Sequence, residues 1–423
     1  MLDINFIKEN KEKVKKAMSD KGLENSVDID KLLEIYNSYL DILRKVEEKR
    51  NYRNKISQDV STATAEEREK LIQQAKSVKE SLQEEEKEMA DLKQKLDEMM
   101  LWVPNVPADD VPVGLGEEDN VEVRREGKVR SFNFDVKDHV ELGKDLDIID
   151  LDRGSKIGGF RGYFLKNEGA LLEQAILKYA YEFMVDQGFT FMSVPWLVNP
   201  DFFVGTGYFP WGEEDHYKVE DKALIGTAEV SLTSYYAGEI LEEKDLPIRL
   251  AALSPCFRRE VGAYGKDTKG IFRLHQFYKV EQVVLCKADE DVSRDWHEKM
   301  LRFSESILEG LALPYRVMLM CSGDTGPGQR KKYDLETWFP SQEAYRETHS
   351  DSYFLDFQAR RLNIRYRDRD GDMKFVHTLN NTVAATPRLL AALIENYQRE
   401  DGSVEIPRAL HKYLNFKKIL PKV

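Results

Sequence analysis

Cys256-Phe-Arg-Arg-Glu260 opens the stretch that decides the fold, and Phe272-Arg-Leu-His-Gln-Phe-Tyr-Lys-Val-Glu281 closes it. A Gly-rich segment lies between them, at residues 261–270. Two strand-like segments around a Gly-rich turn predict a long β-hairpin. Side chains alternate between the faces of a strand. One face of the second segment therefore carries Arg273, His275, Phe277, Lys279 and Glu281, and one face of the first carries Arg258 and Glu260.

This polar face has two interpretations. Cations, carboxylates and an aromatic ring make poor core, but they suit an anionic ligand that carries a planar base and a small ammonium group. The alternative is the solvated face of an ordinary antiparallel sheet. The hairpin alone does not decide between them.

The composition of the 423 residues excludes several classes of protein. The net charge of -13 means that a polyanionic partner must be met by local basic patches. The three cysteines form no CxxC pair, so neither a disulfide framework nor a thiolate zinc site is predicted. The sequence has no signal-peptide pattern and no run of 18 apolar residues. We therefore expect a cytoplasmic protein with no membrane segment.

The first hundred residues predict helices. Residues 1–24 have the pattern of one amphipathic helix. Apolar residues then recur at heptad spacing in two segments, from Leu32 to Val46 and from Leu71 to Met99, with Glu85 in one seam position. A polar break, Ser57 to Ala65, separates them. This pattern predicts an antiparallel helical hairpin over about 28–100, within an N-terminal domain of residues 1–110.

Six cations and two acids lie between Arg44 and Lys55 of this hairpin. The cations are Arg44, Lys45, Lys49, Arg50, Arg53 and Lys55. A solvated helix face with i,i+4 pairs is one interpretation. The other is a surface that binds phosphates, which is attractive only if the rest of the chain acts on a nucleic acid.

Residues 111–423 predict an α+β body, because many strands follow one another with few crossover helices between them. Helices are expected at 168–187, 290–311 and 387–398, and a pair of strands at 353–382. Thr386 is the expected N-cap of the last helix and Pro387 its first residue. Arg388 then lies in the first turn, an unfavourable place for a cation, which suggests an anion nearby.

Several blocks resemble a known family. Residues 257–260 and 273–281 resemble motif 2 of the class II aminoacyl-tRNA synthetases, and residues 378–388 resemble motif 3. Gly188-Phe189 with Val194-Pro195 resembles motif 1, the segment that forms the dimer. Residues 227–229, 333–336, 345–350 and 357–361, together with the helical arm, are most similar to the seryl-tRNA synthetase family. The resemblance covers essentially the whole chain.

The resemblance implies a fold and a reaction. The fold is an antiparallel helical hairpin, a coiled-coil arm, joined to a class II antiparallel β-sheet domain flanked by helices, in a homodimer. The reaction activates L-serine with ATP to seryl-adenylate, which releases pyrophosphate. Serine is then transferred to the 3′ end of tRNA(Ser), with tRNA(Sec) as a second candidate acceptor. Mg²⁺ is the expected metal.

The resemblance also implies roles for single residues, with Arg258 and Arg388 as the catalytic pair. The residues matched to ATP are Arg258, Glu260, Arg273, Phe277, Glu347, Ser350 and Arg388. Those matched to serine are Thr227, Glu229, Arg258, Glu281, Asn380 and Thr382. Glu347 and Ser350 would hold Mg²⁺, whose preferred ligands are hard oxygens. The six cations between Arg44 and Lys55 would bind tRNA.

The sequence departs from the family pattern at two positions. Gly226 stands where many relatives have Pro, which would loosen that loop. Asp351 stands where Cys is common, and we expect its carboxylate to point to solvent and not to strengthen the metal site. Lys266 and Lys269 lie in the hairpin loop, which we expect to close over ATP and then contact the tRNA end.

Two other functions are less consistent with the sequence. An inactive paralogue that only binds tRNA would be expected to lack Arg258, Glu281 or Arg388, and all three are present. A ligase that loads an amino acid onto a carrier protein would be expected to lack the long helical arm.

Overall fold

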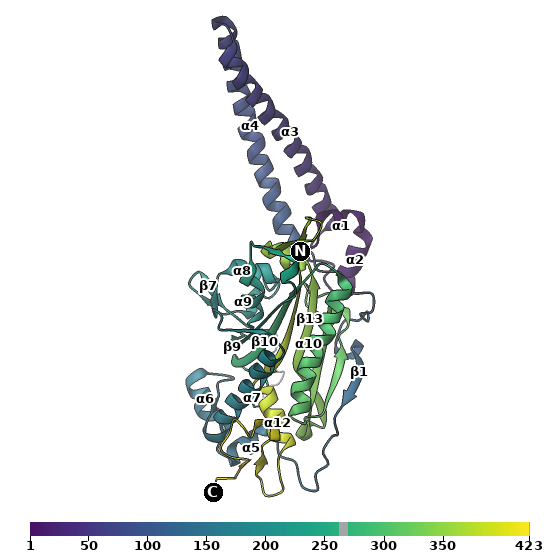
Figure 1. The fold of residues 1–423 in the computed structure, drawn as a ribbon, viewed down its shortest axis with the longest axis vertical. Coiled ribbons are helices and arrows are strands. Elements are labelled where there is room, and N and C mark those ends of the chain that lie inside the picture. The colour runs from purple at the N-terminus through teal and green to yellow at the C-terminus, as the bar shows by residue number, and fades with distance from the viewer. Residues whose placement is uncertain (262–269, 423) are drawn as a thin grey trace. The chain divides into compact units, whose positions relative to one another are not determined.

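The computed structural model describes residues 1–261 and 270–422, and the chain folds as two compact units (Figure 1). The helical unit comprises Leu2–Ser19 and Leu23–Pro104. The sheet unit comprises Asn105–Val423 together with Met1 and Asp20–Gly22. Lys266 and Lys269 lie outside the described residues, so the expectation about the hairpin loop stays a prediction.

Four helices form the helical unit: α1 (Ile4–Glu9), α2 (Lys11–Asp20), α3 (Ile29–Thr62) and α4 (Ala65–Met100). The prediction of one helix over residues 1–24 was wrong, because α1 ends at Glu9 and α2 begins as a separate helix at Lys11. Asn10 caps α1, and its side-chain amide donates to the Phe6 carbonyl at 3.1 Å. The predicted hairpin is confirmed by the long pair α3 and α4. The turn between them is shorter than the predicted break, since a capping box of Thr64 and Glu67 starts α4 at once.

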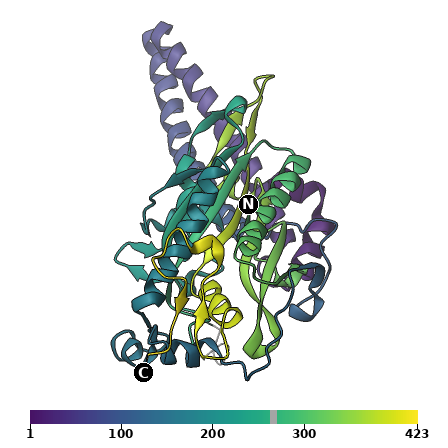
Figure 2. The same ribbon diagram turned by 60° about the horizontal axis from the view of Figure 1, so that its bottom comes forward.

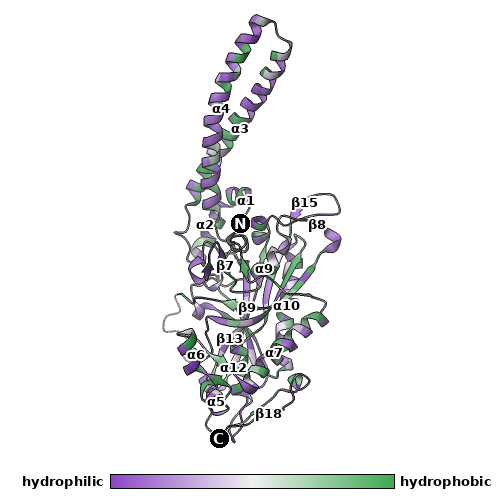
Figure 3. Cartoon of the chain, turned by 90° about the vertical axis from the view of Figure 1, so that its left-hand side faces the viewer, coloured by the Kyte–Doolittle hydropathy of each residue, from purple (hydrophilic) through white to green (hydrophobic). Residues whose placement is uncertain are grey.

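The seam between α3 and α4 follows the heptad pattern. Leu32, Val46 and Leu82 are buried, whereas hydrophilic residues dominate the colouring of both helices (Figure 3). Glu85, the acid in the seam, accepts a hydrogen bond from Lys49 Nζ at 2.8 Å. A charged pair between the helices thus takes the place of an apolar contact at this position.

The sheet unit is built on eight strands in the order β1-β11-β12-β13-β16-β10-β9-β4. Their bounds are β1 Val121–Glu126, β4 Thr190–Met192, β9 Ile248–Phe257, β10 Gln276–Cys286, β11 Tyr315–Leu319, β12 Lys331–Phe339, β13 Ala344–Leu355 and β16 His377–Ala385. Neighbouring strands are antiparallel except for β4, which runs parallel to β9 at one edge. The predicted α+β class is confirmed.

The two faces of this sheet have different covers. Two long helices, α7 (Asn167–Asp186) and α10 (Glu290–Gly310), pack on one face, where Val280 and Val284 join the main core (Figures 1 and 2). The short helices α9 (Glu229–Thr233) and α11 (Phe357–Leu362) pack on the other, over Val283 and Leu285. Alternation along β10 therefore sends Glu281 to the α9 and α11 face.

Three sequence predictions differ from the structure at the ends of elements. The second strand of the hairpin begins at Gln276, so Arg273 and His275 precede it. The last helix, α12 (Arg388–Asn396), has Pro387 at its N-cap, and the Thr386 hydroxyl donates instead to the Tyr278 carbonyl at 3.1 Å. The stretch 353–382 contains α11 as well as strands, and this helix was not predicted.

The remaining elements border the central sheet. The helices are α5 His139–Asp145, α6 Leu151–Gly158 and α8 Pro200–Thr206. The strands are β2 Ile149–Asp150, β3 Phe164–Leu165, β5 Leu197–Val198, β6 Lys218–Val219, β7 Lys222–Leu224, β8 Ile240–Glu242, β14 Arg365–Arg367, β15 Met373–Phe375, β17 Val404–Glu405 and β18 Lys418–Ile419. Among the described residues, no helix combines the length and the apolar character that a membrane crossing needs.

Candidate active site

A buried carboxylate marks one end of the candidate site. Glu229 begins α9 and is only 2% exposed. Its Oε2 accepts hydrogen bonds from Tyr208 Oη at 2.6 Å and Asn380 Nδ2 at 2.5 Å, and its Oε1 accepts one from Gln358 Nε2 at 2.7 Å. Burial raises the pKa of Glu229 to about 7. The acid is thus held by neutral donors in a place that disfavours its charge.

A second buried carboxylate, Glu281, lies on β10 next to this group. The Thr227 hydroxyl donates to its Oε2 at 3.1 Å, and the Lys279 ammonium forms an ion pair with it. Thr382 lies opposite Glu281 in the pairing of β10 with β16, and its hydroxyl is 3.5 Å from Lys279 Nζ. The structure therefore brings the predicted serine set together with Lys279, which the sequence reasoning did not assign.

Arg258 lies at the end of the hairpin, beside the loop that carries Thr227. Its Nε donates to the Gly226 carbonyl at 3.1 Å, and its guanidinium carbon lies 5.4 Å from the centre of the Phe277 ring. The backbone amide of Arg258 donates to the His275 carbonyl at 3.0 Å, and His275 Nδ1 lies 3.0 Å from the Arg258 carbonyl. These contacts extend the hairpin beyond its strands and fix the position of the arginine.

Glu260 lies between two arginines. Its Oε2 is 2.6 Å from Arg273 Nη1 and 3.8 Å from Arg161 Nη1. Its φ of 57° falls in the left-handed region, which is uncommon for residues other than glycine. The predicted pair Glu260 and Arg273 is thus in contact. Arg161 is an additional cation that the sequence analysis did not single out.

The anion expected near Arg388 is Glu347. Nη1 of Arg388 lies 3.0 Å from Oε2 of Glu347 and 2.9 Å from its carbonyl oxygen, and Nε donates to the Phe272 carbonyl at 3.0 Å. Burial acts to raise the pKa of Glu347, but the charges of Arg388 and Lys332 hold it well below its ordinary value. The guanidinium also lies over the Phe272 ring, at 4.8 Å from the ring centre.

A β-bulge aligns Glu347 with Ser350. In the pairing of β12 with β13, His349 lies opposite Leu335 but Glu347 lies opposite Glu336, so Thr348 is the extra residue. Residues three apart on a regular strand point to opposite faces, and the bulge reverses this. Glu347 and Ser350 therefore share a face. Their carboxylate and hydroxyl oxygens fit Mg²⁺, which takes few protein ligands and completes its shell with water and phosphates.

Comparison with known proteins identifies the family. Residues 1–107 match the model of the seryl-tRNA synthetase N-terminal domain, and residues 213–397 match the tRNA synthetase class II core domain (G, H, P, S and T). A serine–tRNA ligase of Deinococcus radiodurans is 43% identical over 99% of each chain, and one of Treponema denticola is 41% identical over 99% of this chain and 100% of its own. The chain belongs to the seryl-tRNA synthetase family.

Solved structures agree with this assignment. Seryl-tRNA synthetase from Pyrococcus horikoshii, complexed with ATP, superimposes with a TM-score of 0.93 at 40% identity and full coverage of both chains. Cytoplasmic serine–tRNA ligase from Naegleria fowleri, in complex with AMP, superimposes with a TM-score of 0.88 at 30% identity, over 100% of this chain and 99% of its own.

The expectation that Asp351 points to solvent was wrong. Asp351 is fully buried beneath α10, with Oδ2 at 3.4 Å from His297 Nε2. Because Ser350 faces the site, the next side chain faces the opposite side of the strand. Burial raises the pKa of Asp351 well above its ordinary value and lowers that of His297 to about 3. Burial thus disfavours the charged form of both groups.

Four residues that contact the predicted site residues were not assigned by the sequence analysis: Arg161, Tyr208, Lys279 and Gln358. Lys279 could have been found, since alternation along the hairpin already placed it on the face of Glu281. Gln358 lies within a block that carries the family resemblance, but nothing in its spacing connects it with Glu229. Arg161 and Tyr208 carry no motif signal.

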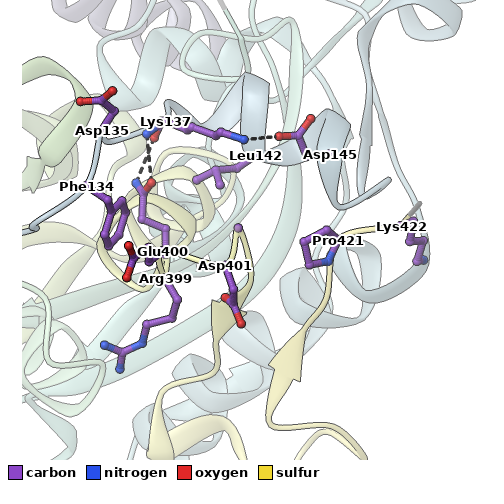
Figure 4. A pocket seen from close by; sticks show the side chains of 12 residues that line it. Phe134, Asp135, Lys137, Leu142, Asp145, Arg399, Glu400, Asp401, Pro421 and Lys422 are labelled. Carbon is purple, nitrogen blue, oxygen red and sulfur yellow. Dashed lines mark hydrogen bonds and ion pairs between the residues drawn. The ribbon is translucent and has the colours of Figure 1, made fainter.

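A separate hollow lies elsewhere in the sheet unit. A cavity of about 350 Å³ is lined by Phe134, Asp135, Lys137, Leu142, Asp145, Gln398, Arg399, Glu400, Asp401, Gly402, Pro421 and Lys422 (Figure 4). Lys137 and Asp145 pair across it at 2.7 Å. None of the predicted site residues lines this cavity, so it is distinct from the candidate active site.

Proposed function

We propose that this chain is a serine–tRNA ligase. It activates L-serine with ATP to seryl-adenylate, releases pyrophosphate, and transfers serine to the 3′ end of tRNA(Ser). The observation that carries this proposal is the buried polar cluster of Glu229, Glu281 and Thr382, with Arg258 bound to the carbonyl of Gly226, next to Thr227. The family and the names of its relatives support it.

This cluster of side chains matches the three polar groups of serine. Glu229 and Thr227 suit the ammonium group, and the guanidinium of Arg258 suits the carboxylate. Glu281, with Asn380 and Thr382, suits the hydroxyl. A site that buries hydrogen-bond partners for a hydroxyl rejects alanine strongly, because those partners would otherwise be left unpaired.

Arg388 and the ring of Phe277, together with Arg258, suit the phosphates and the base of ATP. In the first step a carboxylate oxygen of serine attacks the α-phosphorus, and pyrophosphate leaves. Arg258 would stabilise the charge on the α-phosphate and Arg388 that on the leaving pyrophosphate. Phe277 would stack on adenine, and Glu260 would accept a hydrogen bond from its amino group. Glu347 and Ser350 would hold Mg²⁺, which neutralises phosphate charge when it is bound.

The N-terminal domain, residues 1–110, would bind tRNA through the cations of α3. Lys49 and Arg50 already pair with Glu85 and Glu86 of α4, at 2.8 Å and 2.7 Å. Arg44, Lys45, Arg53 and Lys55 are exposed. These four would therefore carry most of the contact with phosphates.

We also propose a cytoplasmic homodimer that pairs through the motif 1 region. Val185 of α7, Phe191 of β4 and Trp196 are 49%, 38% and 49% exposed. Large apolar side chains gathered on one region of a surface are typical of a protein interface. β4 is also an edge strand of the sheet, with backbone groups available on its outer side.

Pyrophosphate exchange tests this function directly. Exchange of labelled pyrophosphate into ATP is measured with serine, threonine, alanine and glycine. We expect exchange with serine, and weaker exchange with threonine than with serine, since excluding one methyl group is worth only about 1–3 kcal/mol. Alanine is expected to be rejected more strongly. The absence of serine-dependent exchange would overturn the proposal.

A further inference from the structure

A chain of hydrogen bonds runs behind Glu229 and ends on its carboxylate. Gln358 of α11 is 1% exposed, and its Nε2 donates both to Glu229 Oε1 at 2.7 Å and to the Thr206 carbonyl at 3.0 Å. The hydroxyl of Thr378, a fully buried residue of β16, donates to Gln358 Oε1 at 2.6 Å. The amide nitrogen of Gln358 thus donates two hydrogen bonds, and its amide oxygen accepts one.

The hydrogen bonds through Gln358 can run in only one donor-to-acceptor direction. A reversed Gln358 amide would place its oxygen against the Thr206 carbonyl, which only accepts, and against the Glu229 carboxylate, which only accepts when it is ionised. It would also turn its NH₂ toward the Thr378 hydroxyl. That hydroxyl supplies the donor that the Gln358 oxygen needs in the observed orientation. The Thr206 carbonyl therefore sets the direction of the amide, Thr378 completes the arrangement by donating to the amide oxygen, and the amide orients the carboxylate.

The charge of Glu229 depends on its hydrogen-bond donors, and Gln358 is one of them. Its hydrogen-bond donors are neutral: Tyr208, Gln358 and Asn380. Of the charged groups nearby, Glu281 acts to raise its pKa and Lys279 to lower it. Neutral donors stabilise the ionised form without neutralising it. The carboxylate thus keeps an uncompensated charge for a cationic ligand, and loss of one donor favours protonation.

We propose that Gln358 and Thr378 are positioning residues, which orient the Glu229 carboxylate toward the ammonium group of the amino-acid substrate without touching that substrate. This inference rests on the proposed function, because it takes serine as the ligand of Glu229. In this arrangement β16 acts on the Glu229 carboxylate through Gln358 of α11 as well as directly through Asn380.

The test is serine-dependent pyrophosphate exchange by the full-length chain carrying Gln358→Leu or Thr378→Val. Losing a hydrogen bond to a charged group raises the KM for serine about 10- to 100-fold in Gln358→Leu. Thr378→Val keeps its shape and loses only the hydroxyl, and it raises that KM about threefold to tenfold. The KM for ATP stays unchanged in both. Thr378→Ser retains the donor and restores the KM for serine.

A matched control separates positioning from packing. Gln282 is equally buried on the opposite face of the sheet, where its Nε2 donates to the Met300 carbonyl at 3.1 Å. Gln282→Leu is expected to lower the melting temperature and leave the KM for serine unchanged. If the Gln358 and Thr378 variants behave in the same way, the inference is overturned. If the wild-type chain shows no serine-dependent exchange, the proposed function itself fails.

Discussion

Glu229 must be charged to hold an ammonium group, yet its burial opposes that charge. Since burial raises its pKa to about 7, the free enzyme carries a largely protonated Glu229 below that pH. We expect the KM for serine in pyrophosphate exchange to rise as the pH falls below about 7, by up to tenfold per pH unit. The KM for ATP should not follow this profile. A KM for serine that stays flat between pH 5.5 and 8 would contradict the prediction.

Glu229 also makes the free energy of unfolding depend on pH, in the opposite direction to serine binding. Its pKa in the folded chain lies above the ordinary value of 4.5, so the folded state binds more protons than the unfolded state between these pH values. The contribution of Glu229 to the free energy of unfolding therefore falls as the pH rises from about 4.5 to about 7. Serine binding strengthens over that interval, so substrate offsets the cost of the buried charge.

At the scale of elements, the bulge in β13 decides which side chains can reach a metal. Ser350 shares the face of Glu347, whereas Asp351 lies under α10. We expect Ser350→Ala to raise the Mg²⁺ concentration needed for half-maximal exchange. Asp351→Asn should leave it unchanged, because this side chain lies on the opposite face of the strand from Ser350 and an amide has the same shape as the carboxyl. A Mg²⁺ titration of both variants checks this, and an equal effect of the two changes would refute it.

Elements with a clear period were predictable from the sequence, and contacts between elements were not. The expected helix at 290–311 matches α10, because its apolar residues recur at helical spacing. The interior of the hairpin followed from alternation, which also placed Lys279 beside Glu281. The contacts of Gln358 could not be predicted, because its partners Thr206, Glu229 and Thr378 come from three other segments. Asp351 could have been placed by the same alternation, once Ser350 was assigned to the site.

At the scale of the whole molecule, the proposed binding roles fall on different units. The sheet unit holds the residues proposed for serine and ATP, and the helical unit holds the cations proposed for tRNA. We therefore expect that variants can impair the aminoacylation of tRNA without impairing the activation of serine by ATP. Variants for this purpose should avoid Lys49 and Arg50, because their ion pairs with α4 also join the two helices of the arm.

Lys45→Glu with Arg53→Glu is the sharpest test of this division. Both side chains are exposed on α3, and each charge reversal removes an attraction to phosphate and adds a repulsion. We expect the KM for tRNA in aminoacylation to rise at least tenfold and to become less sensitive to salt, while pyrophosphate exchange stays at the wild-type rate. Lys93→Glu on α4, where Lys93 pairs with Asp97, is the control for a charge reversal elsewhere on the arm. An equal loss of exchange and aminoacylation would mean that the helical unit does not act as a separate tRNA module.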